Sequence, residues 1–348
     1  MPRARGYRRR ALALAFGTLA AVVAAEGLAR GLGYHGLADP RVFQYDAEIG
    51  WTLIPNRHEW HSALDFGVWI TTDADGLRAG ARPADSPAHP MRPTVLVLGD
   101  SFAFGWGVRG DQSFPTVLEG ELANTRAPYR IRTAGVPGYS TDQEYLLWRR
   151  LAAVVRPKVV LLLFHPSDFS GNVQASQVMG RNIYFKPRFQ LADGTPHLAG
   201  VPVPDKREWI PSGVTEPLRR WLRPFANYAI AQAAVQRFRG RQTNLAAAST
   251  PRPPELTPDA LAVTAALIAA LNRDVRATGA EVLVALTPSD GATAQRLGDI
   301  CRTQSIPFID LQPAFSGQRD VLLPFDKHWN AHGHAIAARA VAAVLRKP

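Results

Sequence analysis

The chain has 348 residues, of which 46% are hydrophobic and 20% charged, which is the composition of a globular protein. It excludes collagen-like, fibrous and wholly disordered chains, and the length corresponds to about two domains at roughly 150 residues each. The net charge of +11 is concentrated in residues 1–10 and 206–241. Because a nucleic-acid-binding protein would carry a basic stripe across its folded domain, we expect no nucleic-acid partner.

Residues 1–34 have the pattern of a signal-anchor or a secretory signal. Five arginines precede an apolar run from Ala11 to Ala25, and the helical pattern continues past Glu26 to Leu32. That continuation supplies the roughly 20 residues that a spanning helix needs, and it favours an uncleaved anchor. The positive-inside rule then places the rest of the chain outside the cytoplasm. We expect a periplasmic domain anchored in an inner membrane, or a secreted one if the signal is cleaved.

Residues 35–93 predict a small β module followed by a linker. Short β-rich segments, bounded by Asn, Asp and Gly turns, occupy residues 41–75. Residues 79–93 are rich in Ala, Pro and Asp and predict the connection to the main domain.

In the main domain, residues 94–348, apolar runs alternate with helical patterns. We expect strands at residues 94–98, 129–133, 158–164, 281–286 and 307–310, and helices at 114–122, 142–155, 260–278, 292–304 and 331–346. This alternation predicts an α/β fold with an open, doubly wound parallel sheet. In such a sheet the site lies beyond the carboxyl ends of the strands.

An insertion at residues 173–256 interrupts the alternation. It begins with a hairpin pattern around residues 189–198 and continues as a helical stretch, 216–239, that Pro224 splits in two. One interpretation is a cap over the site that lies on the membrane through its arginines and Trp221. The more common alternative is an amphipathic pair packed on the core. Residues 250–255 read as a linker back to the main domain.

Two segments at opposite ends of the main domain carry groups for nucleophilic catalysis. Gly99-Asp100-Ser101 places a serine just past the first strand, where its backbone N–H would face a developing oxyanion. Serine is also a common helix N-cap. Asp326 and His328 supply the carboxylate and the base that such a serine needs. We expect Ser101 as nucleophile, His328 as general base and then acid, and Asp326 as the residue that orients His328.

Other groups in the chain support no metal or cofactor. His332 and His334 could join Asp326 and His328 as ligands, but Asn330 is expected to cap the last helix and so to separate His328 from them. Cys301 is the only cysteine, which excludes an internal disulfide and a multi-cysteine metal site. Trp106 either packs near the serine or stacks on a sugar.

These segments resemble the SGNH, or GDSL, superfamily of serine esterases. Gly99–Ser101 is similar to the family's first block, residues 134–143 to its second, and residues 326–333 to its last; two upstream segments, residues 49–51 and 75–78, are similar to membrane-anchored bacterial members. The resemblance implies the flavodoxin-like doubly wound sheet of SGNH hydrolases. It also implies that the Gly138 N–H joins that of Ser101 in the oxyanion hole.

Two positions depart from the family pattern. The third block usually supplies an asparagine immediately before an aspartate, and this chain has Ser167 before Asp168. The shorter Ser167 side chain is therefore a weak third oxyanion donor, for which Asn172 or a bound water could substitute. One residue separates Asp326 from His328 where many members have two, a spacing found in relatives that modify polysaccharides.

We therefore expect an extracytoplasmic serine esterase without cofactor. Its substrate would be an acyl ester, most plausibly O-acetyl on a cell-envelope or exported polysaccharide. A polysaccharide O-acetyltransferase could use the same serine and pass the acyl group to a sugar hydroxyl. A non-catalytic glycan-binding or assembly protein is a further alternative, because Ser167 weakens the oxyanion hole.

Overall fold

The computed structural model describes residues 2–80, 92–123, 128–179, 182–209, 215–246 and 256–346. Most of the expected linker at residues 79–93, and the linker at 250–255, lie outside the described residues. Contacts divide the chain into two units. The first comprises Met1–Asp39, His61–Gly67 and Ser212–Thr250, and the second comprises the remaining segments.

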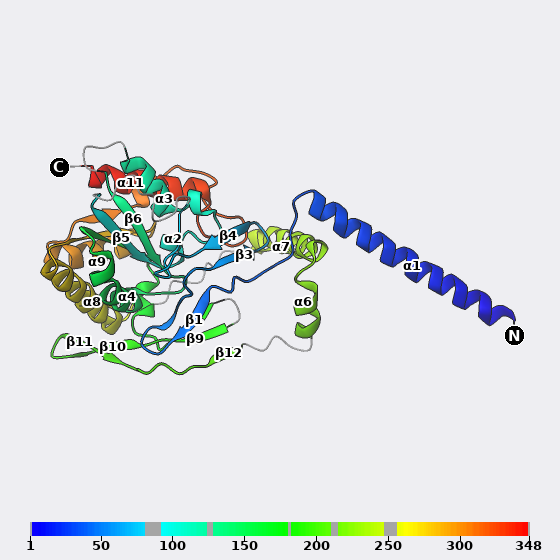
Figure 1. The fold of residues 1–348 in the computed structure, drawn as a ribbon, viewed down its shortest axis with the longest axis horizontal. Helices are drawn as coiled ribbons and strands as arrows, with labels where there is room; N and C mark the ends of the chain where they lie inside the picture. The colour runs from blue at the N-terminus through cyan, green and yellow to red at the C-terminus, as the bar shows by residue number, and fades with distance from the viewer. Residues whose placement is uncertain are drawn as a thin grey trace. The chain divides into compact units, whose positions relative to one another are not determined.

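The second unit contains a five-stranded parallel sheet in the order β14-β13-β7-β5-β6 (Figure 1). Its strands are β5 (Thr94–Gly99), β6 (Arg130–Gly135), β7 (Val159–Phe164), β13 (Glu281–Leu286) and β14 (Phe308–Asp310). In chain order this is the 2-1-3-4-5 arrangement of flavodoxin-like folds, so the predicted fold class is confirmed. The central strand β7 is buried along its whole length, as its unbroken apolar sequence predicts.

Helices cover both faces of this sheet. On one face α4 (Thr141–Val155), α8 (Pro258–Ala277) and α9 (Gly291–Thr303) share a hydrophobic core, and on the other α3 (Phe114–Leu122) and α11 (Ala331–Leu345) share a second (Figure 1). These five helices fall within two residues of their predicted bounds. The buried Cys301 lies near the end of α9. Short helices complete the unit: α2 (Ser101–Phe104), the 3-10 turn η1 (Gly110–Gln112), α5 (Asp168–Gly171) and α10 (Gln312–Phe315).

The predicted β module consists of short hairpins. β1 (Phe43–Asp46) pairs with β2 (Gly50–Leu53), and β3 (His58–Ser62) pairs with β4 (Gly67–Thr71). In the insertion, β10 (Arg188–Ala192) and β11 (Thr195–Ala199) form the predicted hairpin. A three-stranded sheet of β8 (Ser176–Met179), β9 (Asn182–Phe185) and β12 (Arg207–Trp209) was not predicted.

The first unit contains three helices, α1 (Pro2–Gly31), α6 (Glu216–Leu222) and α7 (Ala226–Ala246). Pro224 separates α6 from α7, as predicted. Residues 9–31 of α1 are long and apolar enough to cross a membrane. The insertion is therefore shared, with its strands in the second unit and its helices in the first. The interpretation of these helices as a core-packed pair is wrong for Leu218 and Trp221, whose side chains are 58% and 65% exposed.

Candidate active site

Ser101 begins α2 at the carboxyl end of β5. The strand ends at Gly99, where φ is +151° and an added Cβ would lie 2.6 Å from the Ala103 Cβ. Only glycine fits this tight strand-to-helix turn. Asp100 then caps α2, because its carboxylate accepts a hydrogen bond from the Phe102 N–H at 2.8 Å. The turn therefore fixes Ser101 at the edge of the sheet where parallel α/β folds bind ligands.

The structure brings Ser101, His328 and Asp326 into one chain of hydrogen bonds. The Ser101 Oγ lies 2.7 Å from the His328 Nε2, and the His328 Nδ1 is hydrogen-bonded to the Asp326 Oδ1. An ionised carboxylate can only accept, so the imidazole proton lies on Nδ1 and Nε2 is left to accept the proton of Ser101. This is the donor order of a serine nucleophile with its general base.

The loop that carries His328 is held on both sides. Its backbone donates from Leu323 N–H to the His328 carbonyl at 2.8 Å, and Asn330 caps α11 by accepting from the His332 and Gly333 N–H groups. The expected position of His328, just before the last helix, is confirmed. Lys327 adopts a left-handed conformation with φ +71°, which turns Asp326 and His328 to the same side.

Aromatic rings enclose the His328 imidazole. Its centroid lies 5.0 Å from the Phe102 ring and 6.3 Å from the Trp106 ring. Trp106 Nε1 also donates to the Asp326 Oδ2 at 3.4 Å. Trp106 thus packs at the base and supports the carboxylate, a contact that the sequence analysis missed. Burial alone would raise the pKa of Asp326, but the hydrogen bond and charge of His328 outweigh it and lower that pKa.

Gly138 lies in the loop between β6 and α4. The Val136 N–H donates to the Gly99 carbonyl at 2.9 Å, which ties this loop to the residue two positions before Ser101. Gly138 has φ +82°, and an added Cβ would lie 2.4 Å from the Met179 sulfur. The positive φ favours glycine here, and the Val136 hydrogen bond places the loop next to the strand end that precedes Ser101.

Ser167 precedes α5, just beyond the end of β7, and its hydroxyl already has a partner. Its Oγ lies 2.7 Å from the His165 Nδ1, and its backbone N–H donates to the same nitrogen at 3.3 Å. Because the N–H can only donate, Nδ1 is an acceptor and the hydroxyl donates to it as well. Burial and the nearby His328 lower the pKa of His165, which keeps its imidazole neutral. His165 is therefore a hydrogen-bonded histidine beside the site.

Asn172 does not replace the missing amide. It is buried, its Oδ1 accepts from the Asp142 N–H at 3.0 Å, and its Nδ2 donates to the Thr264 hydroxyl at 2.9 Å. Both ends of the side chain are therefore used inside the core, and this alternative is wrong.

A buried polar cluster joins the starts and ends of the helices that follow β6 and β7. Lys186 donates to the Asp142 carboxylate and to the Gly171 carbonyl, each at 2.8 Å, and both charged side chains are almost fully buried. Burial raises the pKa of Asp142, although Lys186 opposes this, and raises the pKa values of Glu144 and Asp168 well above their usual range. Lys186 comes from the insertion and joins the first turn of α4 to the end of α5.

We expect the Lys186→Met variant to lose about 3–5 kcal/mol of unfolding free energy. The substitution leaves the buried Asp142 carboxylate without its cationic partner. The matched control is Lys206→Met, whose ion pair with Glu208 at 2.9 Å is exposed and should be worth less than about 1 kcal/mol. Chemical denaturation of the two variants measures the difference. Equal destabilisation would contradict a supporting role for Lys186.

His334, one of the histidines considered as a metal ligand, lies in the core. His334 is wholly buried, accepts from the Phe114 N–H at 3.2 Å, and has a pKa lowered by burial to about 3. Among the described residues, no group of three His, Cys, Asp or Glu could hold a metal ion. His334 is thus a neutral core residue.

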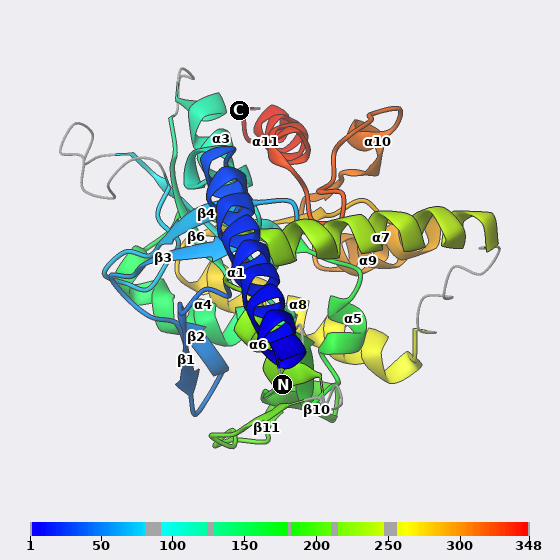
Figure 2. The same ribbon diagram turned by 90° about the vertical axis from the view of Figure 1, so that its right-hand side faces the viewer.

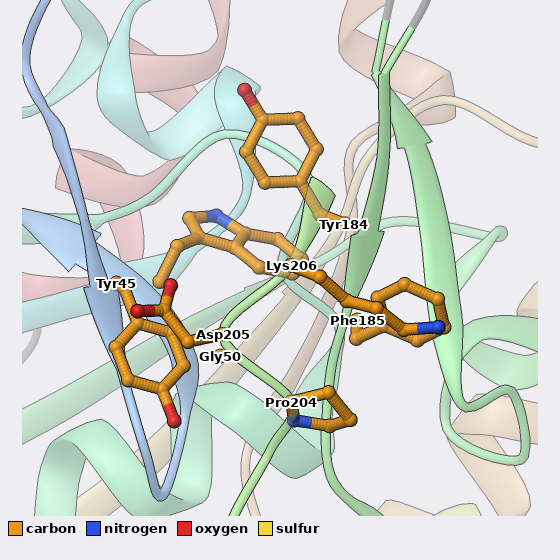
Figure 3. Close-up of a pocket in the computed structure, with 8 residues that line it drawn as sticks. Tyr45, Gly50, Tyr184, Phe185, Pro204, Asp205 and Lys206 are labelled. Carbon is orange, nitrogen blue, oxygen red and sulfur yellow. The ribbon is translucent and has the colours of Figure 1, made fainter. Parts of the chain in front are cut away.

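A small pocket lies between the first hairpin and strands of the insertion (Figure 3). Its lining comes from β1, β2, β9 and the segment before β12, and includes Tyr45, Trp51, Tyr184 and Lys206. Its volume of about 20 Å³ accommodates a single water molecule, so it is no sugar site. Trp51 connects it to the active-site loop, since its indole N–H donates to the Pro137 carbonyl at 3.1 Å.

One protein-family model matches the C-terminal part of the chain. Residues 289–348, which include Asp326 and His328, match the family described as "SGNH hydrolase-like domain, acetyltransferase AlgX". The matched segment is about a sixth of the chain and is similar to an SGNH hydrolase-like domain. A search of curated proteins gives no match.

Several solved structures are similar to the chain at low sequence identity. TesA is 14% identical over 73% of this chain and 98% of its own, with a TM-score of 0.43. A lipase/acylhydrolase from Enterococcus faecalis is 11% identical over 73% and 95%, with a TM-score of 0.41. A catalytic mutant of an acetylxylan esterase from Geobacillus stearothermophilus is 13% identical over 72% and 93%, with a TM-score of 0.39.

The match of residues 289–348 to an SGNH hydrolase-like acetyltransferase domain is compatible with an acyl-ester hydrolase or an acetyltransferase. Both reactions begin with attack of a serine on an acyl ester, and they differ in whether water or a sugar hydroxyl accepts the acyl group. The hydrogen-bond order at Ser101 is compatible with either.

Proposed function

We propose that this protein is an extracytoplasmic serine esterase that removes acyl groups, in particular O-acetyl groups, from a cell-envelope or exported polysaccharide. The observation that carries the proposal is the hydrogen-bond chain from Ser101 through His328 to Asp326. In this proposal residues 1–34 are the membrane anchor, 35–93 the β module and linker, and 94–348 the hydrolase domain. The long apolar helix α1 supports the anchor.

The reaction follows from the positions of these groups. The Ser101 Oγ attacks the ester carbonyl while His328 Nε2 takes its proton, and the N–H groups of Ser101 and Gly138 stabilise the oxyanion. His328 then gives the proton to the departing sugar hydroxyl, which leaves an acyl-Ser101. Water repeats the cycle in reverse: His328 deprotonates it, it attacks the acyl group, and Ser101 leaves with the proton.

An acetyltransferase is the second candidate, favoured by the match of residues 289–348 to the AlgX acetyltransferase family. It shares the acyl-Ser101 and differs only in the acceptor. Incubation of the full chain with an activated acetyl ester, with and without an oligosaccharide acceptor, separates the two. Release of acetate without acceptor supports the esterase, whereas transfer to the sugar with little release of acetate would replace it with the transferase.

The first test of either reaction is labelling of the full chain in detergent with a fluorophosphonate, with the adduct mapped by mass spectrometry. An adduct on Ser101 that is lost in His328→Ala supports a working nucleophile and base. A folded protein that forms no adduct, yet binds glycan equally well as Ser101→Ala, would favour the glycan-binding alternative.

In this proposal Ser167 is a weak third oxyanion donor, because its one hydroxyl proton is committed to His165. We expect Ser167→Asn to raise kcat about tenfold, since an amide has two N–H groups and can serve His165 and the oxyanion together. Ester hydrolysis by the variant, with Ser167→Ala as control, measures this. No gain in Ser167→Asn would mean that another group already fills the third position.

A further inference from the structure

In the first unit, a carboxylate of α1 fixes the start of α7. The two Glu26 oxygens accept hydrogen bonds from the Ala226 N–H at 2.9 Å and the Asn227 N–H at 3.0 Å. Arg30 donates both to Glu26 at 2.8 Å and to the Pro224 carbonyl at 2.7 Å. These bonds join the last turns of α1 directly to the first turn of α7. They therefore hold the two helices at a defined angle.

The two helices cross. Figure 2, which looks towards the N-terminal end of α1, shows α7 running across that helix. The Asn227 side chain of α7 donates to the Val22 carbonyl at 3.3 Å. Val22 lies towards the N-terminus from Glu26, in the apolar stretch of α1. The face of α7 that carries Asn227 therefore points towards the apolar, N-terminal part of α1.

Between Ile230 and Phe238 that same face of α7 is apolar. Ala231, Ala234 and Phe238 follow Asn227 at helical spacings of four, seven and eleven residues, with Ile230 and Val235 beside them. Ile230, Val235 and Phe238 are 38%, 44% and 63% exposed. The opposite side of this helix carries Gln232 and Gln236 together with Ala229 and Ala233.

Both α6 and α7 carry arginines next to exposed aromatic residues. Arg237 and Arg239 flank Phe238 on α7, and Arg219 and Arg220 lie on α6 next to the exposed Trp221. The Trp221 and Phe225 rings pack together at 5.4 Å. Tryptophan beside arginine is the composition of helices that lie in the headgroup layer of a membrane, where the arginines meet anionic lipid.

We propose that α6 and α7 form an interfacial membrane-binding element, whose apolar face, Ala231, Ala234 and Phe238, rests on the bilayer that α1 crosses. Its partner is the anionic phospholipid surface. A helix that crosses α1 lies parallel to the bilayer, and the Asn227 contact turns its apolar side toward the lipid. The inference goes beyond the proposed chemistry and depends only on α1 spanning the membrane.

Site-specific fluorescence tests the proposal in the full chain. Single cysteines at Ala234→Cys and Phe238→Cys report the apolar face, Gln236→Cys is the matched control on the opposite side, and Leu19→Cys marks the middle of α1. Each receives an environment-sensitive dye after reconstitution in bilayers of phosphatidylethanolamine and phosphatidylglycerol. The native Cys301 is buried, which raises the pKa of its thiol to about 12, so it stays unlabelled in the folded protein.

We expect lipids with a spin label near the headgroup to quench the dyes at positions 234 and 238 at least about twofold more than the dye at 236. The dye at position 19 should be quenched by spin labels deep in the acyl chains. Equal quenching at 234, 236 and 238, with position 19 still deep, would overturn the interfacial element and leave the anchor intact. A position 19 accessible to aqueous iodide would overturn both. Labelling of Ser101 by fluorophosphonate, measured in the same samples, reports the chemistry independently.

Discussion

Ser101→Ala is expected to remove the fluorophosphonate adduct and to lower kcat for ester hydrolysis by about 10⁶-fold. The Oγ is the only atom of the site that is both hydrogen-bonded to the base, at 2.7 Å, and placed at the carboxyl end of β5. Alanine keeps the start of α2, because the cap comes from the Asp100 carboxylate and not from Ser101. The loss would therefore be chemical and not a failure to fold.

The matched control is Ser289→Ala, which changes a serine that follows β13 at the same edge of the sheet. Its hydroxyl makes only a long local bond to the Asp290 carbonyl at 3.4 Å. We expect this variant to keep both the adduct and the rate. A Ser101→Ala protein that still forms the adduct, or still hydrolyses the ester, would exclude Ser101 as nucleophile.

The sequence predicts the sheet well because its strands are buried on both faces. Runs such as Val159–Phe164 are apolar at every position, and a parallel strand between two helical layers accepts no other pattern. The three-stranded sheet of the insertion escaped prediction because Ser176–Met179 and Asn182–Phe185 are short, half-exposed and mixed in polarity. Such strands have no periodicity that separates them from loops.

The site was predictable where spacing constrains it. A serine after one strand and a histidine two residues from an aspartate suffice to indicate Ser101, His328 and Asp326, since loops at the carboxyl edge of the sheet converge. The bond between Ser167 and His165 depends instead on the local geometry of one turn. The burial of Lys186 depends on where the insertion packs, and neither leaves a mark in the sequence.

Asp326→Asn is expected to lower kcat about 10⁴-fold and to leave KM nearly unchanged. In the native protein the carboxylate accepts from Nδ1 of His328, so Nε2 is free to take the proton of Ser101. An asparagine amide can donate to Nδ1 instead, which moves the imidazole proton to Nε2 and removes the base. Because Asp326 contacts His328 and not the substrate position, binding should survive the change.

Trp106→Phe tests how much the hydrogen bond from Trp106 to Asp326 contributes, separately from the bond between Asp326 and His328. It removes the N–H that donates to Oδ2 at 3.4 Å and retains a ring beside His328. A long hydrogen bond of this kind contributes about 0.5–1.5 kcal/mol, so the rate should fall by about tenfold at most. Steady-state kinetics on both variants, with circular dichroism as the check of folding, give the comparison. If Asp326→Asn cost no more than Trp106→Phe, the tautomer of His328 would be set by some other group, and Asp326 would be a structural residue.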